Sequence, residues 1–263
     1  MATTFPQVSE KAKVYRVTNS TMDTARLQSM FGMNGKEVYN GSDCKVYRDK
    51  DNSLEIFNAG SFRYINEPEL IRFEKNSVLP SKEEAINIAS QFLIKNKILP
   101  TGAFVSGVYY DESYTAHKGI EGSTCFIPHM CVSFGIKING EKVYGPGAKI
   151  NVYIGDGGKI ICLYKAWKEI EEVQAKNIIT PQKALERLEK RSVVNSYWGG
   201  TTGCGDIQSI EIQNMALTYY IEPTEPDSPS QQPLLEPVYV FEGVVKGTTK
   251  EKKFFWKESA LGE

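Results

Sequence analysis

The sequence predicts an α+β protein built of tandem modules, in each of which one helix packs on a curved antiparallel sheet. Three observations lead to this prediction. Strong hairpin signals lie in the middle of the chain, two helix starts of similar form recur along it, and strand-like runs follow each helix. We place boundaries near residues 78 and 177, which gives modules at 1–78, 79–177 and 178–263.

The N-terminal module begins with an alternating strand at 13–17. N-cap candidates follow, and a helix with apolar residues at helical spacing is expected to end at Gly32. Strand-like runs separated by turn residues then occur at 38–39, 44–48, 54–57 and 62–65. The turn at 49–55 begins like a calcium-binding loop. It lacks the glycine and the glutamate that such a loop requires, so a hairpin turn is the better interpretation.

The central module starts at Ser81-Lys-Glu-Glu84, a capping box in which Ser81 and Glu84 each satisfy a free amide of the first helical turn. Pro100 closes the segment. The stripe predicted to face a sheet consists of Ala85, Ile86, Ala89, Phe92 and Leu93. A strand at 103–110 and a polar insertion at 111–128 are expected to follow the helix.

A three-stranded meander is predicted from 130 to 167. Asn139-Gly140 and Asp156-Gly157 are residue pairs that tolerate positive φ at both centres of a type I′ turn, the turn that suits a tight hairpin. Apolar residues alternate at 150, 152 and 154, so one face of the strand is apolar. Because such a ribbon needs a cover, we expect the helix at 81–96 to pack on it.

The third module repeats this pattern, with Thr180 as N-cap, Pro181 at the first helical position and apolar residues facing inward. A glycine-rich loop at 195–206 precedes a long strand. No Lys-Ser/Thr pair follows the glycines, so the loop does not fit a phosphate-binding site. A proline-rich surface excursion and a further hairpin complete the chain.

Charge and hydropathy limit the possible function classes. The 31 basic and 32 acidic residues nearly cancel, which disfavours a nucleic acid partner. No apolar run approaches the length that crosses a bilayer, and the N-terminus lacks the features of a secretion signal. Two interpretations remain: a soluble cytoplasmic protein, or the mature part of an envelope protein whose leader or membrane anchor was removed.

The five cysteines show no repeated spacing, so they do not form the framework of a small secreted domain. Cys125 and Cys131 flank a short segment and form a possible disulfide in an oxidising compartment, whereas Cys162 fits a strand core. With His129 between them, the first two also resemble the start of a zinc site. The paired Cys-x2-Cys spacing and a fourth ligand are missing, so we predict no metal site.

No catalytic or cofactor signature is present. A nucleophile needs a base poised beside it, and the only histidines are His117 and His129, for which no orienting group is evident. We therefore expect a protein that is not an enzyme and carries no cofactor. Aromatic residues are abundant, and those on an outer sheet face are candidates for a recognition patch: Tyr153, Trp167 and Tyr239.

The capped helix followed by antiparallel strands and Asp-Gly-x-Lys-Ile resembles the PepSY superfamily. Residues 81–89 and 150–161 carry the resemblance, and 180–188 repeat its first half. The segment at 235–243 and the tandem order of the modules resemble YycI-type cell-envelope proteins. The chain departs from these in lacking their N-terminal membrane helix and in the insertion at 111–128.

The resemblance implies a cystatin-like sheet around a helix, located outside the cytoplasmic membrane, and no catalytic residue to carry over. It leads us to expect a non-catalytic extracytoplasmic regulatory protein that binds a protein or peptide and modulates a peptidase or a sensor kinase. The alternative is a small apolar-ligand-binding protein or a hydrolase, with a pocket between helix and sheet.

Overall fold

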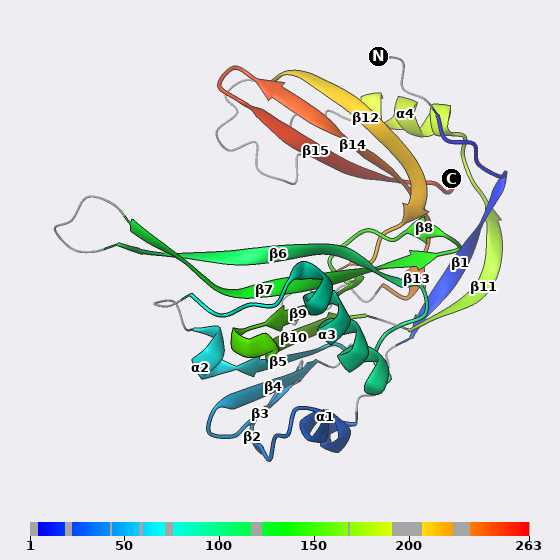
Figure 1. The fold of residues 1–263 in the computed structure, drawn as a ribbon. Helices are drawn as coiled ribbons and strands as arrows, with labels where there is room; N and C mark the ends of the chain where they lie inside the picture. Colours follow the sequence, from blue (N-terminus) through cyan, green and yellow to red (C-terminus); the bar gives the residue numbers. More distant parts are fainter. Residues whose placement is uncertain are drawn as a thin grey trace. The chain divides into compact units, whose positions relative to one another are not determined.

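The computed structural model describes residues 5–18, 23–42, 44–57, 60–71, 76–116, 123–167, 169–190, 207–222 and 232–262. Strands make up 56% and helices 18% of this part of the chain, arranged in three antiparallel sheets (Figure 1). The chain divides into two compact units. The larger unit comprises Thr18–Glu169 and Ile221–Gln231, and the smaller unit comprises Met1–Val17, Ile170–Tyr220 and Gln232–Glu263.

The predicted fold class of tandem helix-on-sheet modules is wrong, because the fold is dominated by sheet. Strands from the first two predicted modules join in one nine-stranded sheet. The junction is the pairing of β5 (Phe62–Asn66) with β10 (Ile160–Ala166), in which Ile65 lies opposite Cys162. Because β5 and β10 pair, the two groups of strands satisfy backbone groups that two separate sheets would each leave unpaired at an edge. The boundaries near 78 and 177 stay a prediction.

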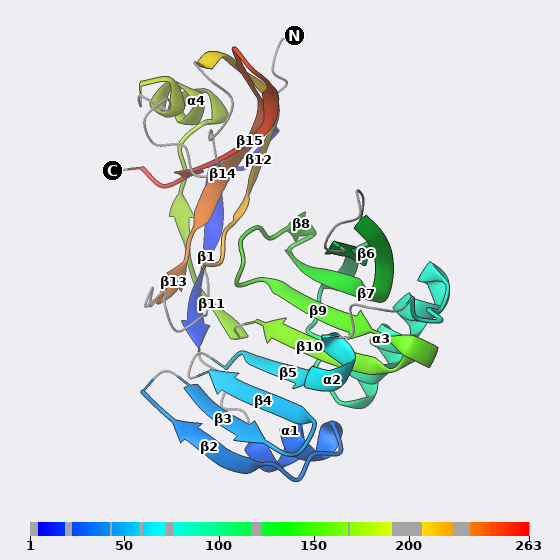
Figure 2. The same ribbon diagram turned by 90° about the vertical axis from the view of Figure 1, so that its left-hand side faces the viewer.

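The nine-stranded sheet forms the frame of the larger unit, and Figure 2 shows β2 and β6 at its opposite edges. A short strand, β8 (Glu141–Lys142), pairs with β7 outside the main order. The main order is β2 (Lys36–Asn40), β3 (Cys44–Arg48), β4 (Asn52–Phe57), β5, β10, β9 (Lys149–Ile154), β7 (Ser123–Ile138) and β6 (Ala103–Ala116).

The predicted central helix is confirmed as α3 (Lys82–Lys95). Both capping-box bonds form: the Glu84 amide donates to Ser81 Oγ at 3.2 Å, and the Ser81 amide donates to Glu84 Oε2 at 2.9 Å. Three residues of the predicted stripe, Ala85, Ala89 and Leu93, are buried in one cluster with strand residues from 130 to 163. The helix therefore packs on the ribbon predicted for it, and this face of the sheet is called the helix face below.

Other local signals of the larger unit are confirmed as well. The helix α1 (Thr24–Met30) is capped by Asp23, which accepts a bond from the Arg26 amide, and it ends just before Gly32. A short helix, α2 (Glu67–Leu70), follows β5. Asn139 and Gly140 both have positive φ, 53° and 86°, as the predicted hairpin turn requires. The second hairpin turn is longer than predicted, because a 3₁₀ turn occupies Asp156–Gly158.

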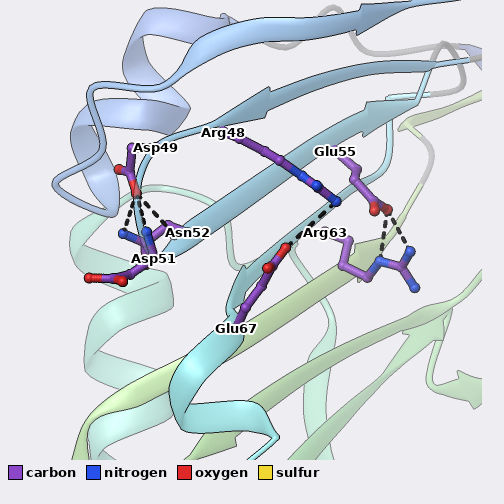
Figure 3. A network of polar contacts seen from close by, with 7 residues as sticks. All are labelled: Arg48, Asp49, Asp51, Asn52, Glu55, Arg63 and Glu67. Atoms are coloured by element: carbon purple, nitrogen blue, oxygen red, sulfur yellow. Dashed lines mark hydrogen bonds and ion pairs between the residues drawn. The ribbon is translucent and has the colours of Figure 1, made fainter.

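The turn at 49–55 is a hairpin between β3 and β4, as predicted. Asp49 Oδ1 accepts bonds from the Asp51 amide at 3.1 Å and from the Asn52 amide and Nδ2 at 2.9 Å each (Figure 3). Burial works to raise the pKa of Asp49, but these bonds and one from the Asn34 backbone outweigh it and lower the pKa. The Asp49 carboxylate thus accepts hydrogen bonds within the turn and stabilises it, which explains this residue without a bound cation.

The smaller unit contains two three-stranded sheets. One has the order β11 (Glu169–Asn177), β1 (Lys11–Thr18) and β13 (Leu234–Leu235), and the other has the order β12 (Ile207–Tyr219), β14 (Pro237–Gly247) and β15 (Glu251–Ser259). The third predicted helix is confirmed as α4 (Pro181–Lys190), and Thr180 Oγ1 accepts a bond from the Lys183 amide at 3.2 Å. Ala184 and Leu188 are buried in one cluster with residues of β12, β14 and β15.

No helix in the described ranges is long and apolar enough to cross a membrane.

Candidate functional site

Two of the three predicted binding aromatics lie in the protein interior. Tyr239 is 0% exposed and its hydroxyl donates to the Ile179 carbonyl at 2.7 Å, while Trp167 is 6% exposed. Tyr153 is half-buried on β9, and its ring centroid lies 5.8 Å from that of His129. The binding role of the three residues stays a prediction, but only Tyr153 presents part of its ring outside the core.

The predicted disulfide between Cys125 and Cys131 does not fit the strand that carries both residues. The two thiols are free, and both residues belong to β7. An extended strand rises about 3.3 Å per residue, so their Cα atoms lie roughly 20 Å apart. A disulfide joins Cα atoms about 4.4–6.8 Å apart. The sequence suggested a loop between them, and the continuous strand explains why they do not meet.

The face of the sheet opposite α3, called the far face, gathers polar groups at one place. Three valines that pack in the core under α3 lie opposite one another on neighbouring strands: Val108 on β6, Val132 on β7 and Val152 on β9. Successive strand residues point to opposite sides, so their neighbours share the far face. The residues next to these valines, Tyr109, Cys131 and Tyr153, also lie opposite one another. Two residues further along β6, on the same face, Asp111 lies opposite His129 of β7.

This far-face cluster does not form a poised nucleophile. Burial, followed by the charge of Asp111, raises the pKa of Cys131 to about 11, so the thiol is protonated at neutral pH. His129 is buried, and its Nε2 lies 3.0 Å from Asp111 Oδ2. The alignment of that contact falls short of hydrogen-bond geometry, and Nδ1 of His129 has no partner among the described residues. Burial also raises the pKa of Tyr153.

The described part of the chain has an open hollow of about 560 Å³ over β12, β14 and β15, lined by residues that include Gln213, Glu242 and Phe255. It contains no group of three or more His, Cys, Asp and Glu side chains that could hold a metal ion. The cavity beside Trp167, also lined by Phe134 and Ile150, measures about 10 Å³, which is at the lower limit for one water molecule. His117, Cys204 and the glycine-rich stretch at 199–205 lie outside the described residues.

The most distinctive surface feature of the larger unit is its edge strand β6. Among the described residues β6 has a strand partner on one side only, β7, and it is 14 residues long. The opposite edge strand, β2, has 5 residues. Figure 1 shows β6 and β7 continuing past the ends of β9 and β10. The pairing agrees, because β9 covers only residues 130–134 of β7.

Three tyrosines stand exposed along β6. Tyr109, Tyr110 and Tyr114 are 57%, 43% and 61% exposed. The Tyr109 ring lies over Gly107, on the far face. The Tyr114 hydroxyl donates to Glu112 Oε2 at 2.6 Å, and this bond, followed by the contact with Cys125, raises the pKa of Tyr114 to about 12.

The β6–β7 ladder consists of three regular runs separated by two register shifts. Register shifts occur between Val105 and Gly107 and between Asp111 and Ser113, so Ser106 and Glu112 have no partner in register. The regular segment Gly107–Asp111 lies between them and carries Tyr109 and Tyr110. On the helix-face side, Lys82 Nζ lies 5.6 Å from the centroid of the Tyr110 ring.

Sequence reasoning missed the outer part of this edge, residues 111–116. The strand was predicted to stop at 110, and 111–128 was predicted as a polar insertion. In the structure Asp111–Ala116 continues β6, and β7 already begins at Ser123. The aromatic residue at 114 and the apolar pair at 126–127 were signals for a longer hairpin, and they could have been found.

Comparison with known proteins gives no assignment: the chain matches no family model and no curated protein. The resemblance to the PepSY superfamily and to YycI-type proteins therefore stays a prediction.

Proposed function

We propose that this protein is a non-catalytic, extracytoplasmic regulatory protein that binds an extended segment of a partner protein along β6. The observation that carries the proposal is the 14-residue edge strand with three exposed tyrosines. An extended peptide can add to such an edge as a further strand. Main-chain hydrogen bonds then supply affinity, and side chains at alternate positions supply specificity.

The composition of β6 supports this role. Natural sheets blunt their edges with charged residues, above all lysine, with proline, with bulges or with very short strands, because an unblocked edge pairs with other chains. The sequence of β6, AFVSGVYYDESYTA, contains no lysine, arginine or proline, and its acidic residues and its bulge are confined to Asp111–Glu112 and Ser106. At the opposite edge, β2 is short and contains a lysine, so it follows the usual protection. The long edge is the one left open for a partner.

The regular segment Gly107–Asp111 indicates the size and character of the bound strand. About five residues of a partner can pair along this segment. Tyr109 lies on the far face and Tyr110 on the helix face, so the bound strand meets an aromatic ring on each side. Exposed tyrosines supply large contact areas at low entropic cost, and they are enriched in binding hot spots. We expect a partner segment with apolar side chains on both faces.

The envelope location and the partner class rest on the resemblance alone. The capped helix at 81–89 and the strand pair at 150–161 carry it, and both motifs occur here as a helix and a hairpin that share one core. By this likeness the partner is a peptidase or a sensor kinase. Cell fractionation with an antibody to the protein tests the location, and recovery from the cytosolic fraction would contradict it.

Selection from a random-peptide display library on the immobilised protein tests binding. Affinity for the enriched peptides is then measured by titration calorimetry. The variant Tyr109→Ser/Tyr110→Ser/Tyr114→Ser is expected to weaken binding at least tenfold, because a hot-spot residue is worth about 2 kcal/mol or more.

The opposite edge of the same sheet offers a matched control. Val38 and Tyr39 on β2 are 57% and 56% exposed, and the Tyr39 ring lies over Gly41 as the Tyr109 ring lies over Gly107. The variant Val38→Ser/Tyr39→Ser should leave affinity unchanged. Peptides whose affinity falls only in the β2 variant, or in neither variant, would contradict binding along β6.

A further inference from the structure

We propose that Asn139 is a site of spontaneous covalent modification, at which the side-chain amide is lost and an aspartate or isoaspartate remains. The chain contains three Asn-Gly pairs: Asn34-Gly35, Asn40-Gly41 and Asn139-Gly140. Glycine after asparagine favours this reaction, because it has no side chain that hinders attack on the asparagine. The structure distinguishes the third pair from the other two, and the inference does not depend on the proposed function.

The reaction needs only water and the two residues of the pair. The backbone nitrogen of Gly140 loses its proton and forms a bond to Cγ of Asn139. The bond from Cγ to Nδ2 breaks, and Nδ2 leaves as ammonia with a proton that replaces the one given up by Gly140. Water then opens the resulting ring at either of its two carbonyl groups, which gives aspartate or isoaspartate. An amide held in a hydrogen bond loses its proton less readily, so the bonding of the glycine amide controls the rate.

The glycine amides of the first two pairs are bonded, and that of the third is not. The Gly35 amide donates to Gln28 Oε1 at 2.8 Å, and the Gly41 amide donates to the Cys44 carbonyl at 3.0 Å. The Gly140 amide has no hydrogen-bond partner among the described residues. It belongs to a two-residue turn, in which the bonds of the ladder run between the flanking residues 138 and 141. The nitrogen that must attack is therefore available only in the third pair.

The space around the three glycines favours the same pair. A Cβ atom placed on Gly35 would lie 3.1 Å from the Arg48 backbone, and the Tyr39 ring covers Gly41. A Cβ atom placed on Gly140 would meet nothing within 4 Å. Both residues of this turn are also exposed, so water reaches the ring that forms there. The asparagine side chain and the glycine nitrogen can thus approach each other at this turn without displacing a neighbour.

The modification changes the turn that positions β8. Isoaspartate adds a carbon atom to the backbone of a two-residue turn, and either product adds a negative charge. The Val143 amide, just beyond β8, donates to the Ile136 carbonyl of β7 at 2.9 Å. We expect the isoaspartate form to loosen β8 from β7, because turn length fixes the register of a hairpin. Hydrogen exchange of the Val143 amide should become faster in that form, and unchanged exchange would contradict this consequence.

Incubation of the folded protein at mildly alkaline pH, followed by mass spectrometry of tryptic peptides, tests the proposal. Lys36 separates Asn34 from Asn40, so the three asparagines fall in three different peptides. The peptide with Asn139 should be converted about tenfold faster than the other two, because one hydrogen bond on the attacking amide corresponds to roughly that factor in rate. In concentrated urea the three rates should become similar. Equal rates in the folded protein would overturn the proposal.

Gln28 on α1 allows a direct test of the protecting bond. Gln28→Ala removes the acceptor of the Gly35 amide and should raise the rate at Asn34 about tenfold. Gln28→Glu keeps an acceptor oxygen at the same place and should leave that rate low. The rate at Asn139 should be the same in both variants, and unfolding curves show that each remains folded. An unchanged rate at Asn34 in Gln28→Ala would overturn the reasoning from the bonded amide.

Discussion

Replacement of Leu93 by alanine tests whether α3 is held by the nine-stranded sheet. Leu93 is 0% exposed and belongs to the core cluster that the helix shares with the strands. Truncating a fully buried leucine removes its transfer free energy and leaves a cavity, which together cost about 2–5 kcal/mol. We expect about 3 kcal/mol here, because the neighbouring strands are hydrogen-bonded on both sides and cannot move far into the space.

The next residue of the helix provides the matched control. Ile94 is 61% exposed, so Ile94→Ala removes little buried area, and alanine is also the better helix former. The free energy of unfolding should change by less than about 0.5 kcal/mol.

Urea unfolding of the two variants, followed by circular dichroism, measures the difference. With an m-value of roughly 2 kcal/mol/M, Leu93→Ala should lower the midpoint of the larger unit by about 1.5 M, and Ile94→Ala should not move it. Trp167, which is 6% exposed in the same unit, contributes a fluorescence signal for this transition. Equal shifts for the two variants, or none for Leu93→Ala, would show that α3 does not pack on the sheet as described.

Three further predictions follow from single sites. Gly243→Ala should cost about 1–3 kcal/mol, because the new Cβ would meet the Glu211 carbonyl and the Ile212 backbone, whereas Gly262→Ala, which meets nothing within 4 Å, should be neutral in thermal unfolding. Burial lowers the pKa of Lys165, so the native state binds its proton less tightly than the unfolded state. The free energy of unfolding should therefore rise with pH from the lowered pKa towards the model value of 10.5, and Lys165→Met should remove this rise and stabilise the protein at neutral pH. Iodoacetamide at pH 8 should label exposed Cys125 quickly and Cys131 only after unfolding, as peptide mass spectrometry would show; equal labelling rates would contradict the burial.

Local signals in the sequence predicted local structure well. The capping box at Ser81 and the positive-φ pair Asn139-Gly140 each act within a few residues, so the chain on either side has little influence on them. The apolar stripe of α3 also predicted which side of the helix is buried. These elements follow from hydrogen-bond satisfaction and periodicity, which a single sequence displays directly.

Long-range pairing was not predictable in the same way. Nothing in residues 62–66 specifies a partner almost a hundred positions later, yet β5 and β10 pair and merge two expected modules into one sheet. Which face of a strand is covered also depends on distant elements. The sequence made Tyr239 a candidate for the surface, but in the structure it is buried in one cluster with residues of α4, and its hydroxyl donates to the Ile179 carbonyl. The polar run from Asp111 to Ser113 suggested a loop, but a two-stranded arm accepts polar residues because both of its faces can meet water.

The two edges of the large sheet show which features of β6 are specific to it. The Tyr39 ring covers Gly41 at the β2 edge, and the Tyr109 ring covers Gly107 at the β6 edge. An aromatic ring over a glycine therefore occurs at both edges of the sheet and has a structural role there. Exposure of the two tyrosines is also nearly equal, 56% and 57%. What separates the edges is length and composition, because only β6 extends over 14 residues without a lysine, arginine or proline. A functional role should therefore depend on main-chain pairing along β6 and not on a tyrosine alone. Replacing Tyr109 by phenylalanine, which keeps the ring over Gly107, should preserve partner binding.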